Sequence, residues 1–316
     1  MRRNNVKPEG AVRLFCFPVC RGFFDAASRQ VAELGRFKDM IADISSLELA
    51  GGVSMPSIGL GTWPMRGQEA AAAVLSALDV GYRRIDTAEN YENEDAVGKA
   101  LAQSRLHRDE IFVTTKFNKQ WHSAQGVRQA LENSLERLGL EYVDLFLIHW
   151  PNPQQNTYVE AFTELGKLVD EGKIRAAGVS NFKPYQLQNV LDSGLVPALN
   201  QIQVDPERQS VEWQGFNTEH GVRTEAYSPL GRKKSGLLSH PALVRIAQAH
   251  GKSSAQVTLR WHVQSGRAAA PKSADQRRQS ENLDIFDFQL TQAEMAAINA
   301  MDTGAGPFTD SDEFGH

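Results

Sequence analysis

The chain has 316 residues, of which 41% are hydrophobic and 23% are charged, as in ordinary globular proteins. Its formal net charge of -4 gives no reason to expect a nucleic acid or an anionic membrane as partner, and no apolar run approaches the roughly 20 residues of a membrane span. Both cysteines, Cys16 and Cys20, lie near the N-terminus, so the rest of the chain can form neither a disulfide framework nor a thiolate metal site.

The first 40 residues differ in composition from the rest, with eight Lys and Arg against four Asp and Glu. A signal peptide is not indicated, because the apolar stretch at 11–20 is interrupted by Arg13 and Pro18 and lacks a small-residue cleavage site. An organellar presequence fits the arginine content only weakly. We therefore expect residues 1–40 to be a disordered extension, or sequence upstream of a true start at Met40. Residues 41–316 are expected to form a single, cytoplasmic and monomeric domain.

After Met40 the chain begins with a β-hairpin pattern at 46–63, where Gly51 and Gly52 form the turn. Strand and helix patterns then alternate. Apolar runs and polar/apolar alternation predict strands at 82–88, 111–117, 143–150, 174–181, 198–204, 222–231 and 266–273. Helical spacing predicts helices at 67–81, 93–104, 123–139, 158–172, 183–194, 210–221, 241–251, 254–266, 277–286 and 291–302.

Counting the strand that ends at Thr62, eight strand-plus-helix units follow one another without a Pro/Gly/Ser-rich linker. Regular alternation implies a parallel sheet with right-handed crossovers. Eight units over roughly 250 residues fit a closed barrel better than two doubly wound domains. We therefore predict an α/β fold, a (β/α)8 TIM barrel with an N-terminal β-hairpin and an extra helix at the C-terminal end.

A barrel of this kind places chemistry at the carboxyl ends of its strands. Polar residues gather at these positions in this chain, and packing alone does not explain them. They are Asp86, Lys116, His149, Asn181, Gln201, Tyr227 and Lys272.

Several common sites are absent from the sequence. The Gly59–Gly61 segment has Pro64 where a dinucleotide fingerprint needs its third glycine, and no Walker loop, HExxH or G-x-S-x-G motif occurs. The eight histidines include no close pairing with a carboxylate that singles out a metal site. We therefore expect no bound metal. We also do not expect a hydrolase or lyase, because such a barrel enzyme would need a metal or a pair of carboxylates at the strand ends.

Asp86, Tyr91, Lys116 and His149 remain as a set that can handle a proton. A free tyrosine has a pKa near 10, and a neighbouring ammonium lowers that pKa by favouring the phenolate. Lys116 could act on Tyr91 in this way, with Asp86 keeping the lysine charged and His149 orienting a substrate oxygen. Each residue alone also has a structural explanation, as a cap, a rim aromatic, a solvated charge or a buried histidine. Because all four residues lie at or just after strand ends, a shared catalytic role is favoured over four separate structural explanations.

The motifs IDTAENYENE, TTK, LIHWP, GVSNF, AYSPLG and PKS, followed by ENLDIFDF, resemble those of the aldo-keto reductase family in order and spacing. The resemblance covers residues 47–310 and is greatest to the bacterial 2,5-diketo-D-gluconate reductase group. It implies NADPH-dependent reduction of a carbonyl group, with Tyr91 as proton donor, Lys116 and Asp86 as its support, and His149 orienting the carbonyl.

The resemblance also implies a set of cofactor-binding residues. Ser180, Asn181 and Gln201 match those that hold the nicotinamide carboxamide, and Tyr227 matches the aromatic that stacks on the nicotinamide ring. Thr62, Ser228, Leu230 and Gly231 complete the nicotinamide and pyrophosphate region. Lys272, Ser273 and Arg278 match the 2′-phosphate site, and Glu281 and Asn282 the adenine side. A lysine and an arginine fork distinguish a phosphate from a hydroxyl, which favours NADPH over NADH.

The sequence departs from the family pattern in two places. Relatives usually continue after Gln201-Ile202 with an acid, His-Pro and an aromatic, whereas this chain has Gln203-Val204-Asp205-Pro206-Glu207. Asn118 stands where an aromatic often follows the lysine. Because of the first change, the resemblance does not predict how that loop packs. Because of the second, it does not predict the substrate. Trp63 and Trp150 are candidates for the apolar walls of the substrate pocket. The short tail after Met301 favours small polar carbonyls, 2,5-diketogluconate-like or methylglyoxal-like, and a non-catalytic NADPH-binding regulatory protein is the alternative.

Overall fold

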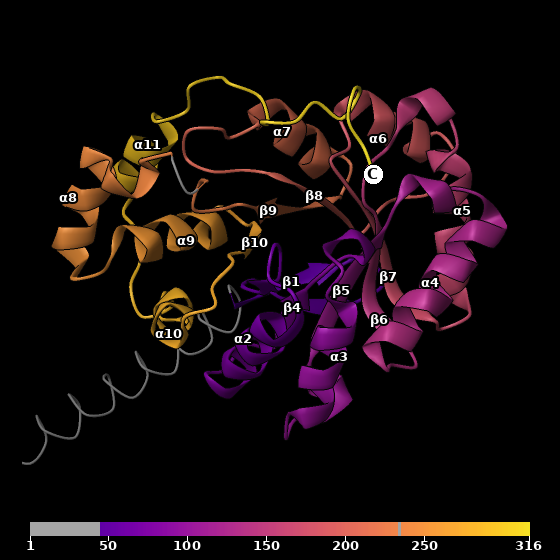
Figure 1. Cartoon of the computed structure of the whole chain (residues 1–316). Helices are drawn as coiled ribbons and strands as arrows, with labels where there is room; N and C mark the ends of the chain where they lie inside the picture. The colour runs from indigo at the N-terminus through magenta and orange to yellow at the C-terminus, as the bar shows by residue number, and fades with distance from the viewer. Residues whose placement is uncertain (1–44, 233–234) are drawn as a thin grey trace, which may run out of the picture. The chain divides into compact units, whose positions relative to one another are not determined.

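The computed structural model describes residues 45–232 and 235–316, and these residues belong to one compact unit (Figure 1). The prediction for residues 1–40 lies outside the described residues. None of the described helices is long and apolar enough to cross a membrane.

Eight parallel strands form the central sheet, in the order β10-β9-β8-β7-β6-β5-β4-β3. Their bounds are β3 Leu60–Gly61, β4 Arg84–Asp86, β5 Phe112–Phe117, β6 Val143–Ile148, β7 Ile174–Ser180, β8 Leu199–Gln203, β9 Arg223–Tyr227 and β10 Ala268–Ala270. The two edges meet, because the Gly59 amide donates to Ala269 O at 3.0 Å and the Gly61 amide to Pro271 O at 3.1 Å. The predicted (β/α)8 barrel is confirmed.

Helices surround the barrel and end close to their predicted limits (Figure 1). Their bounds are α2 Gly67–Asp79, α3 Glu94–Gln103, α4 Ala124–Leu138, α5 Tyr158–Asp170, α6 Pro184–Leu191, α7 Val211–Glu219, α8 Pro241–His250, α9 Ser254–Gln264, α10 Gln276–Leu283 and α11 Gln292–Asn299. Local chemistry sets several limits. The Ser123 hydroxyl caps α4 by accepting from the Gly126 amide, and Gly139 ends it with φ 65°. Short 3-10 turns lie in the loops at η1 Glu89–Tyr91, η2 Arg108–Glu110, η3 Lys119–Trp121, η4 Pro153–Gln155 and η5 Leu237–Ser239.

Alternation along the strands separates two apolar cores. Outward-facing residues such as Ile85, Val113 and Phe146 pack against the helices in the larger cluster. Inward-facing residues such as Phe112, Leu145 and Leu147 belong to a second cluster. That second cluster also contains the apolar side chains of the hairpin formed by β1 Ser46–Leu49 and β2 Val53–Pro56. The predicted N-terminal hairpin is therefore present and packs on the barrel interior.

The same alternation decides which polar residues face inward. Strand β4 points Ile85 outward and therefore points Arg84 and Asp86 into the barrel. On β5, the side chain of Lys116 shares the inward face with Phe112. His149 follows β6 in phase with Leu145 and Leu147. On β6 the polar residue at the carboxyl end, His149, thus follows apolar inward residues, whereas on β4 both inward residues are charged.

His122, just after η3, is buried against the edge of the Phe117 ring, and both of its ring nitrogens lack a hydrogen-bond partner. Burial lowers the pKa of His122 to about 4 from 6.5. Between these two pH values the unfolded chain binds a proton that the folded chain excludes, so stability falls as the pH drops through this window. We expect this residue to remove about 3 kcal/mol from the free energy of unfolding between pH 6.5 and pH 4.

Urea unfolding of the wild type and of His122→Leu at several pH values checks this expectation. Other acidic and basic groups titrate in both proteins, so the difference between the two curves isolates His122. The free energy of unfolding of the variant should increase relative to that of the wild type as the pH falls. Parallel curves would show that His122 is protonated equally in the folded and unfolded states.

Candidate active site

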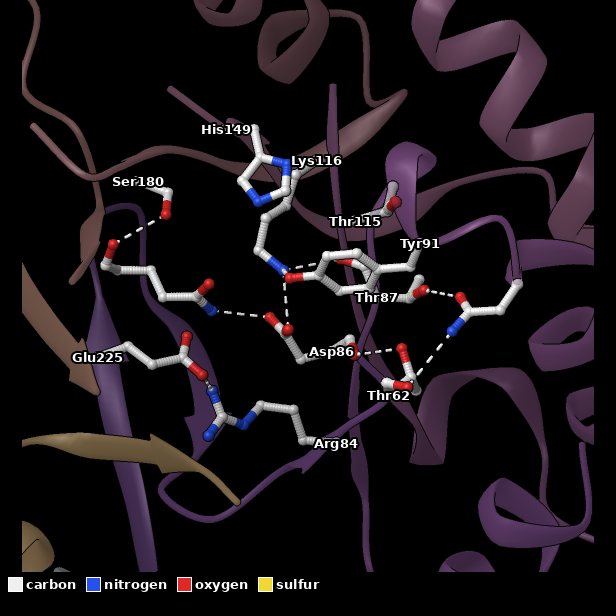
Figure 2. A network of polar contacts seen from close by, with 12 residues as sticks. Thr62, Arg84, Asp86, Thr87, Tyr91, Thr115, Lys116, His149, Ser180 and Glu225 are labelled. Carbon is white, nitrogen blue, oxygen red and sulfur yellow. Dashed lines mark hydrogen bonds and ion pairs between the residues drawn. The ribbon is translucent and has the colours of Figure 1, made fainter. Parts of the chain in front are cut away.

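Four side chains from separate strand ends and loops meet at one end of the barrel (Figure 2). Asp86 ends β4, Lys116 lies near the end of β5, His149 follows β6, and Tyr91 is the last residue of η1. The Lys116 ammonium lies between the other groups. It donates to Asp86 Oδ1 at 2.7 Å, to Thr87 O at 2.8 Å and to the Tyr91 hydroxyl at 3.4 Å. Lys116 is 0% exposed, so all of its donors are directed at protein groups.

Burial and charge act in opposite directions on Lys116. Burial lowers its pKa, but the Asp86 carboxylate, which is close and hydrogen-bonded, raises it, and the net shift is upward. Lys116 is therefore an ammonium at neutral pH. The buried cation is stable only because Asp86 accompanies it.

The pKa of Tyr91 is raised overall, because burial outweighs the lowering effect of the Lys116 charge. The effect of Lys116 has the direction expected from the sequence, but burial, which the sequence argument did not include, is larger. Lys116 limits the rise instead. The Tyr91 hydroxyl carries its proton at neutral pH, and the phenolate left after proton loss would lie next to a fixed ammonium.

His149 contacts Tyr91 edge-on, with ring centroids 5.7 Å apart. Burial, followed by the charges of Lys116 and His316, holds the pKa of His149 well below 6.5. The imidazole is therefore neutral. A neutral ring carries one N–H and can donate it to a substrate oxygen that lies close to the Tyr91 hydroxyl.

Residues at the ends of β7 and β9 form a second group beside the first. Asn181 adopts a left-handed conformation with φ 65°, which asparagine tolerates. Its amide donates to His149 O and to Ser180 Oγ, both at 3.0 Å, and accepts from the Tyr227 hydroxyl at 2.9 Å. Ser180 in turn donates to Gln201 O at 2.8 Å. These contacts fix Ser180, Asn181 and Tyr227 next to the first group. We call that first group, Asp86, Tyr91, Lys116 and His149, the acid–base group.

Gln201 and Thr62 bind Asp86 directly. The Gln201 amide donates from Nε2 to Asp86 Oδ2 at 2.8 Å, and the Thr62 hydroxyl donates to Asp86 O at 3.0 Å. The sequence grouped Gln201 with the carboxamide-binding residues. The structure shows that Gln201 fixes the second oxygen of the Asp86 carboxylate. No local sequence signal could have revealed this contact, because 115 positions separate the two residues.

Ser228, Leu230 and Gly231 form a turn after β9, closed by a 3.0 Å hydrogen bond from the Gly231 amide to Ser228 O. Gly231 has φ 74°, and a Cβ there would lie 2.6 Å from Ser235 Oγ, so this position requires glycine. Ser228 and Leu230 are half-buried.

The segment after β10 carries exposed cations at the start of α10. Lys272 is exposed and makes no ion pair among the described residues. The Arg278 guanidinium reaches only Asp275, at 3.8 Å, with 67% of its side chain exposed. Asp275 caps α10, and Ser273 holds the capping segment through a 3.1 Å bond to Asp275 O. Glu281 is half-buried and Asn282 is buried. Two exposed cations, one of them unpaired among the described residues and one only weakly paired, are suited to a phosphate.

The two tryptophans that were expected to line the site differ in exposure. Trp63 is 62% exposed, whereas Trp150 is buried beside His149. The C-terminal segment adds Phe314, whose ring meets Trp150 at 5.0 Å, and His316, whose ring lies 5.9 Å from that of His149. The sequence did not reveal this role for the tail.

The tail ends beside α6 (Figure 1), and polar contacts fasten it to the start of α6 and to the loop that follows β5. Lys183 pairs with both Asp310 and Asp312 at 2.5 Å, and the Lys119 amide donates to His316 O at 2.6 Å. Gly315 is packed against Asn152 so closely that a Cβ could not be accommodated. We call residues 307–316 the tail clamp.

The residues that depart from the family pattern make contacts of their own. The side-chain oxygen of Gln203 accepts a hydrogen bond from the backbone N–H of Phe308 at 3.0 Å. Asp205 pairs with Arg208 through two backbone hydrogen bonds. Asn118 is buried, and its backbone N–H donates to Glu89 Oε2 at 3.3 Å. Glu89 also accepts from Trp121 Nε1 at 2.8 Å. The altered loops are therefore packed, and one of them holds the tail clamp.

Among residues 45–232 and 235–316, no group of three or more His, Cys, Asp or Glu side chains is arranged to hold a metal ion.

Comparisons with known proteins agree with the fold and the motifs. A sequence profile described as "Aldo/keto reductase family" matches residues 57–303. Methylglyoxal reductase DkgA of Yersinia pestis is 44% identical over 271 residues, which cover 85% of this chain and 97% of that protein. An aldo-keto reductase of Mycobacterium sp. (strain KMS) is 43% identical over 258 residues, covering 80% and 92%.

Solved structures are similar over comparable lengths. An aldo/keto reductase from Brucella melitensis superposes with a TM-score of 0.78 at 42% identity, covering 81% of this chain and 99% of that one. A Bombyx mori aldo-keto reductase in complex with NADP gives a TM-score of 0.79 at 33% identity, covering 84% and 95%. With its barrel, its motifs and these relatives, the chain belongs to the aldo/keto reductase family.

Proposed function

We propose that this protein reduces the carbonyl group of small polar aldehydes and ketones to an alcohol, with NADPH as the reductant. The observation that carries the proposal is the buried Lys116 ammonium, held by Asp86 and directed at the Tyr91 hydroxyl. A bound NADPH supplies the hydride in such a reaction. The chain then has to bind and orient the carbonyl and deliver one proton to its oxygen.

Tyr91 is the proton donor in this proposal. Its raised pKa keeps the hydroxyl protonated at neutral pH, and Lys116 offsets the negative charge that forms on the phenol oxygen during transfer. Asp86 keeps Lys116 charged and in place. The neutral His149 donates a hydrogen bond to the carbonyl oxygen and orients it toward Tyr91.

The cofactor-binding roles are proposed from the donor groups beside this site. Ser180, Asn181 and Gln201 present amide and hydroxyl groups where a carboxamide would be held, and Tyr227 presents a ring. The turn with Ser228 and Leu230 would line the pyrophosphate, with Thr62 beneath. Lys272, Ser273 and Arg278 would receive the 2′-phosphate, with Glu281 and Asn282 on the adenine side. The two exposed cations at α10 support NADPH over NADH.

Small polar substrates are favoured by the narrow surroundings of His149. Trp150, Phe314 and His316 bring rings close to it, and the tail clamp adds carbonyl and carboxylate groups. Relatives such as that of Yersinia pestis are called methylglyoxal reductases. The non-catalytic alternative is disfavoured, because a regulatory protein would have no need of all four residues Asp86, Tyr91, Lys116 and His149.

A panel of carbonyl compounds tests the proposal by following NADPH oxidation. Methylglyoxal and small keto-sugar acids should be reduced with a higher kcat/KM than bulky apolar aldehydes. NADPH binding without turnover of any carbonyl would overturn the proposal and revive the regulatory alternative.

Arg278→Met tests the 2′-phosphate role. Loss of the guanidinium removes charge-assisted hydrogen bonds to a phosphate that NADH lacks, so Kd for NADPH should rise by about 10- to 100-fold. Kd for NADH should change less than about twofold, since no such bonds are lost. Quenching of intrinsic tryptophan fluorescence measures both. Arg105→Met, at an exposed arginine after α3 that makes no ion pair among the described residues, is the matched control and should leave both constants unchanged.

A further inference from the structure

A second buried ion pair lies directly beneath the acid–base group (Figure 2). Arg84 of β4 and Glu225 of β9 meet at 2.6 Å, and both side chains are 0% exposed. Arg84 also donates from Nη2 to Ala269 O at 2.8 Å and to Ser57 O at 3.2 Å. The pair therefore crosses the barrel interior between β4 and β9.

The surroundings are shaped to admit this arginine. A Cβ at Gly59 would lie 2.5 Å from Arg84 Nε, so the glycine leaves room for the guanidinium. Met55 of the hairpin contacts it from below at 3.5 Å. Stability is a weak explanation for such a pair, because replacing a buried ion pair with apolar groups of similar volume is often neutral or stabilising.

Gln201 connects this pair to the catalytic carboxylate. Its Nε2 donates to Asp86 Oδ2, while Asp86 Oδ1 accepts from Lys116. The Gln201 amide also acts on Glu225, where it opposes the rise in the pKa of that carboxyl caused by burial and by Asp86. One neutral amide thus lies between two carboxylates, each of which has its own cation.

The charges around Glu225 come from few elements. Strand β4 contributes Arg84 and Asp86, and β5 contributes Lys116. Tyr91 of η1 lies beyond Lys116. Strand β8 faces Glu225 with the neutral Gln201, and β10 provides only backbone and alanines. The Glu225 charge raises the pKa of both Tyr91 and Lys116, so Glu225 acts on the proton donor through space.

We propose that the Arg84–Glu225 pair is a positioning unit for proton transfer. It keeps the layer beneath the acid–base group electrically neutral. In doing so it sets the pH range over which Tyr91 donates its proton. The inference deepens the proposed function and rests on it for the kinetic test alone.

Glu225→Gln removes the negative charge and leaves Arg84 uncompensated. The apparent pKa on the alkaline limb of kcat should fall by on the order of one unit, because the unpaired cation favours the phenolate. Arg84→Met/Glu225→Gln removes both charges and should return that pKa to the wild-type value. Glu225→Asp retains the charge but shortens the side chain, so it should keep the wild-type pKa while lowering kcat. Kd for NADPH should stay unchanged in all three.

Ultraviolet difference titration of tyrosinate, wild type minus Tyr91→Phe, measures the pKa of the same hydroxyl in the free protein, over the pH range in which circular dichroism shows a native fold. A Glu225→Gln profile that coincides with the wild type in both measurements would overturn the inference. A double variant that fails to restore the wild-type pKa would do so as well. A shifted tyrosinate titration in a protein that reduces no carbonyl would refute the proposed function and leave this inference intact.

Discussion

Tyr91→Phe should lower kcat for carbonyl reduction by about 10²- to 10⁴-fold, the range typical for loss of a positioned general acid. The substitution keeps the ring that packs edge-on against His149 and removes only the hydroxyl that Lys116 contacts. Because the ring remains, neither the barrel nor the cofactor region should rearrange. Steady-state NADPH oxidation with the best carbonyl of the panel measures the loss.

Two controls accompany the Tyr91 variant. Kd for NADPH, measured by fluorescence quenching, should stay within about twofold of the wild type, as expected for a residue that acts only on the reacting oxygen. Tyr142→Phe removes a phenol hydroxyl that precedes β6, at the other end of that strand from His149, and should leave kcat unchanged. Turnover retained above a tenth of the wild-type value in Tyr91→Phe would show that another group supplies the proton.

Lys116→Met should cost both activity and stability. It leaves the Asp86 carboxylate buried without its cation, a change that typically destabilises by about 3–5 kcal/mol. It also removes the charge that offsets the Tyr91 phenolate, so kcat should fall by at least about 100-fold. Urea unfolding and NADPH oxidation give the two values. Lys99→Met is the matched control, because the Lys99–Asp95 pair is largely exposed and should contribute less than about 1 kcal/mol.

Asp86→Asn combined with Lys116→Met separates the two effects. Removing both charges should recover much of the lost stability, since no uncompensated charge remains buried, while kcat stays low. If the double variant were no more stable than Lys116→Met, the loss would come from packing of the lysine stem rather than from charge.

Much of the fold could be predicted because the spacing of apolar residues along the chain indicates each strand and helix. Strand β5 is a continuous buried run, and its neighbours are helices with caps and terminal glycines that the sequence shows directly. The gathering of Asp86, Lys116 and His149 followed from the barrel, because alternation and strand ends determine where such residues point.

The contacts that could not be predicted join residues far apart in the chain. Arg84 and Glu225 are separated by 141 positions, and Gln201 and Asp86 by 115. No pattern within either strand indicates its partner across the barrel. The net shift in the pKa of Tyr91 could not be predicted for a related reason, because burial depends on the whole fold whereas the neighbouring lysine could be inferred from motif order.

The altered loop after Gln201 illustrates the same limit. The sequence showed that a histidine and an aromatic were missing, but it did not show what replaced them. In the structure Gln203 accepts the Phe308 amide, so a departure within the barrel is matched by a contact in the tail clamp.

The fastening of the tail clamp differs in kind from that of the acid–base group. Lys183 is 20% exposed, and Asp310 and Asp312 are 52% and 38% exposed, so dissolved ions can screen these pairs. The Lys116–Asp86 pair is shielded from solvent and therefore from that screening. Ionic strength thus acts on the two halves of the site separately. Added salt is expected to weaken the fastening of the tail clamp and to leave the Lys116–Asp86 pair unchanged.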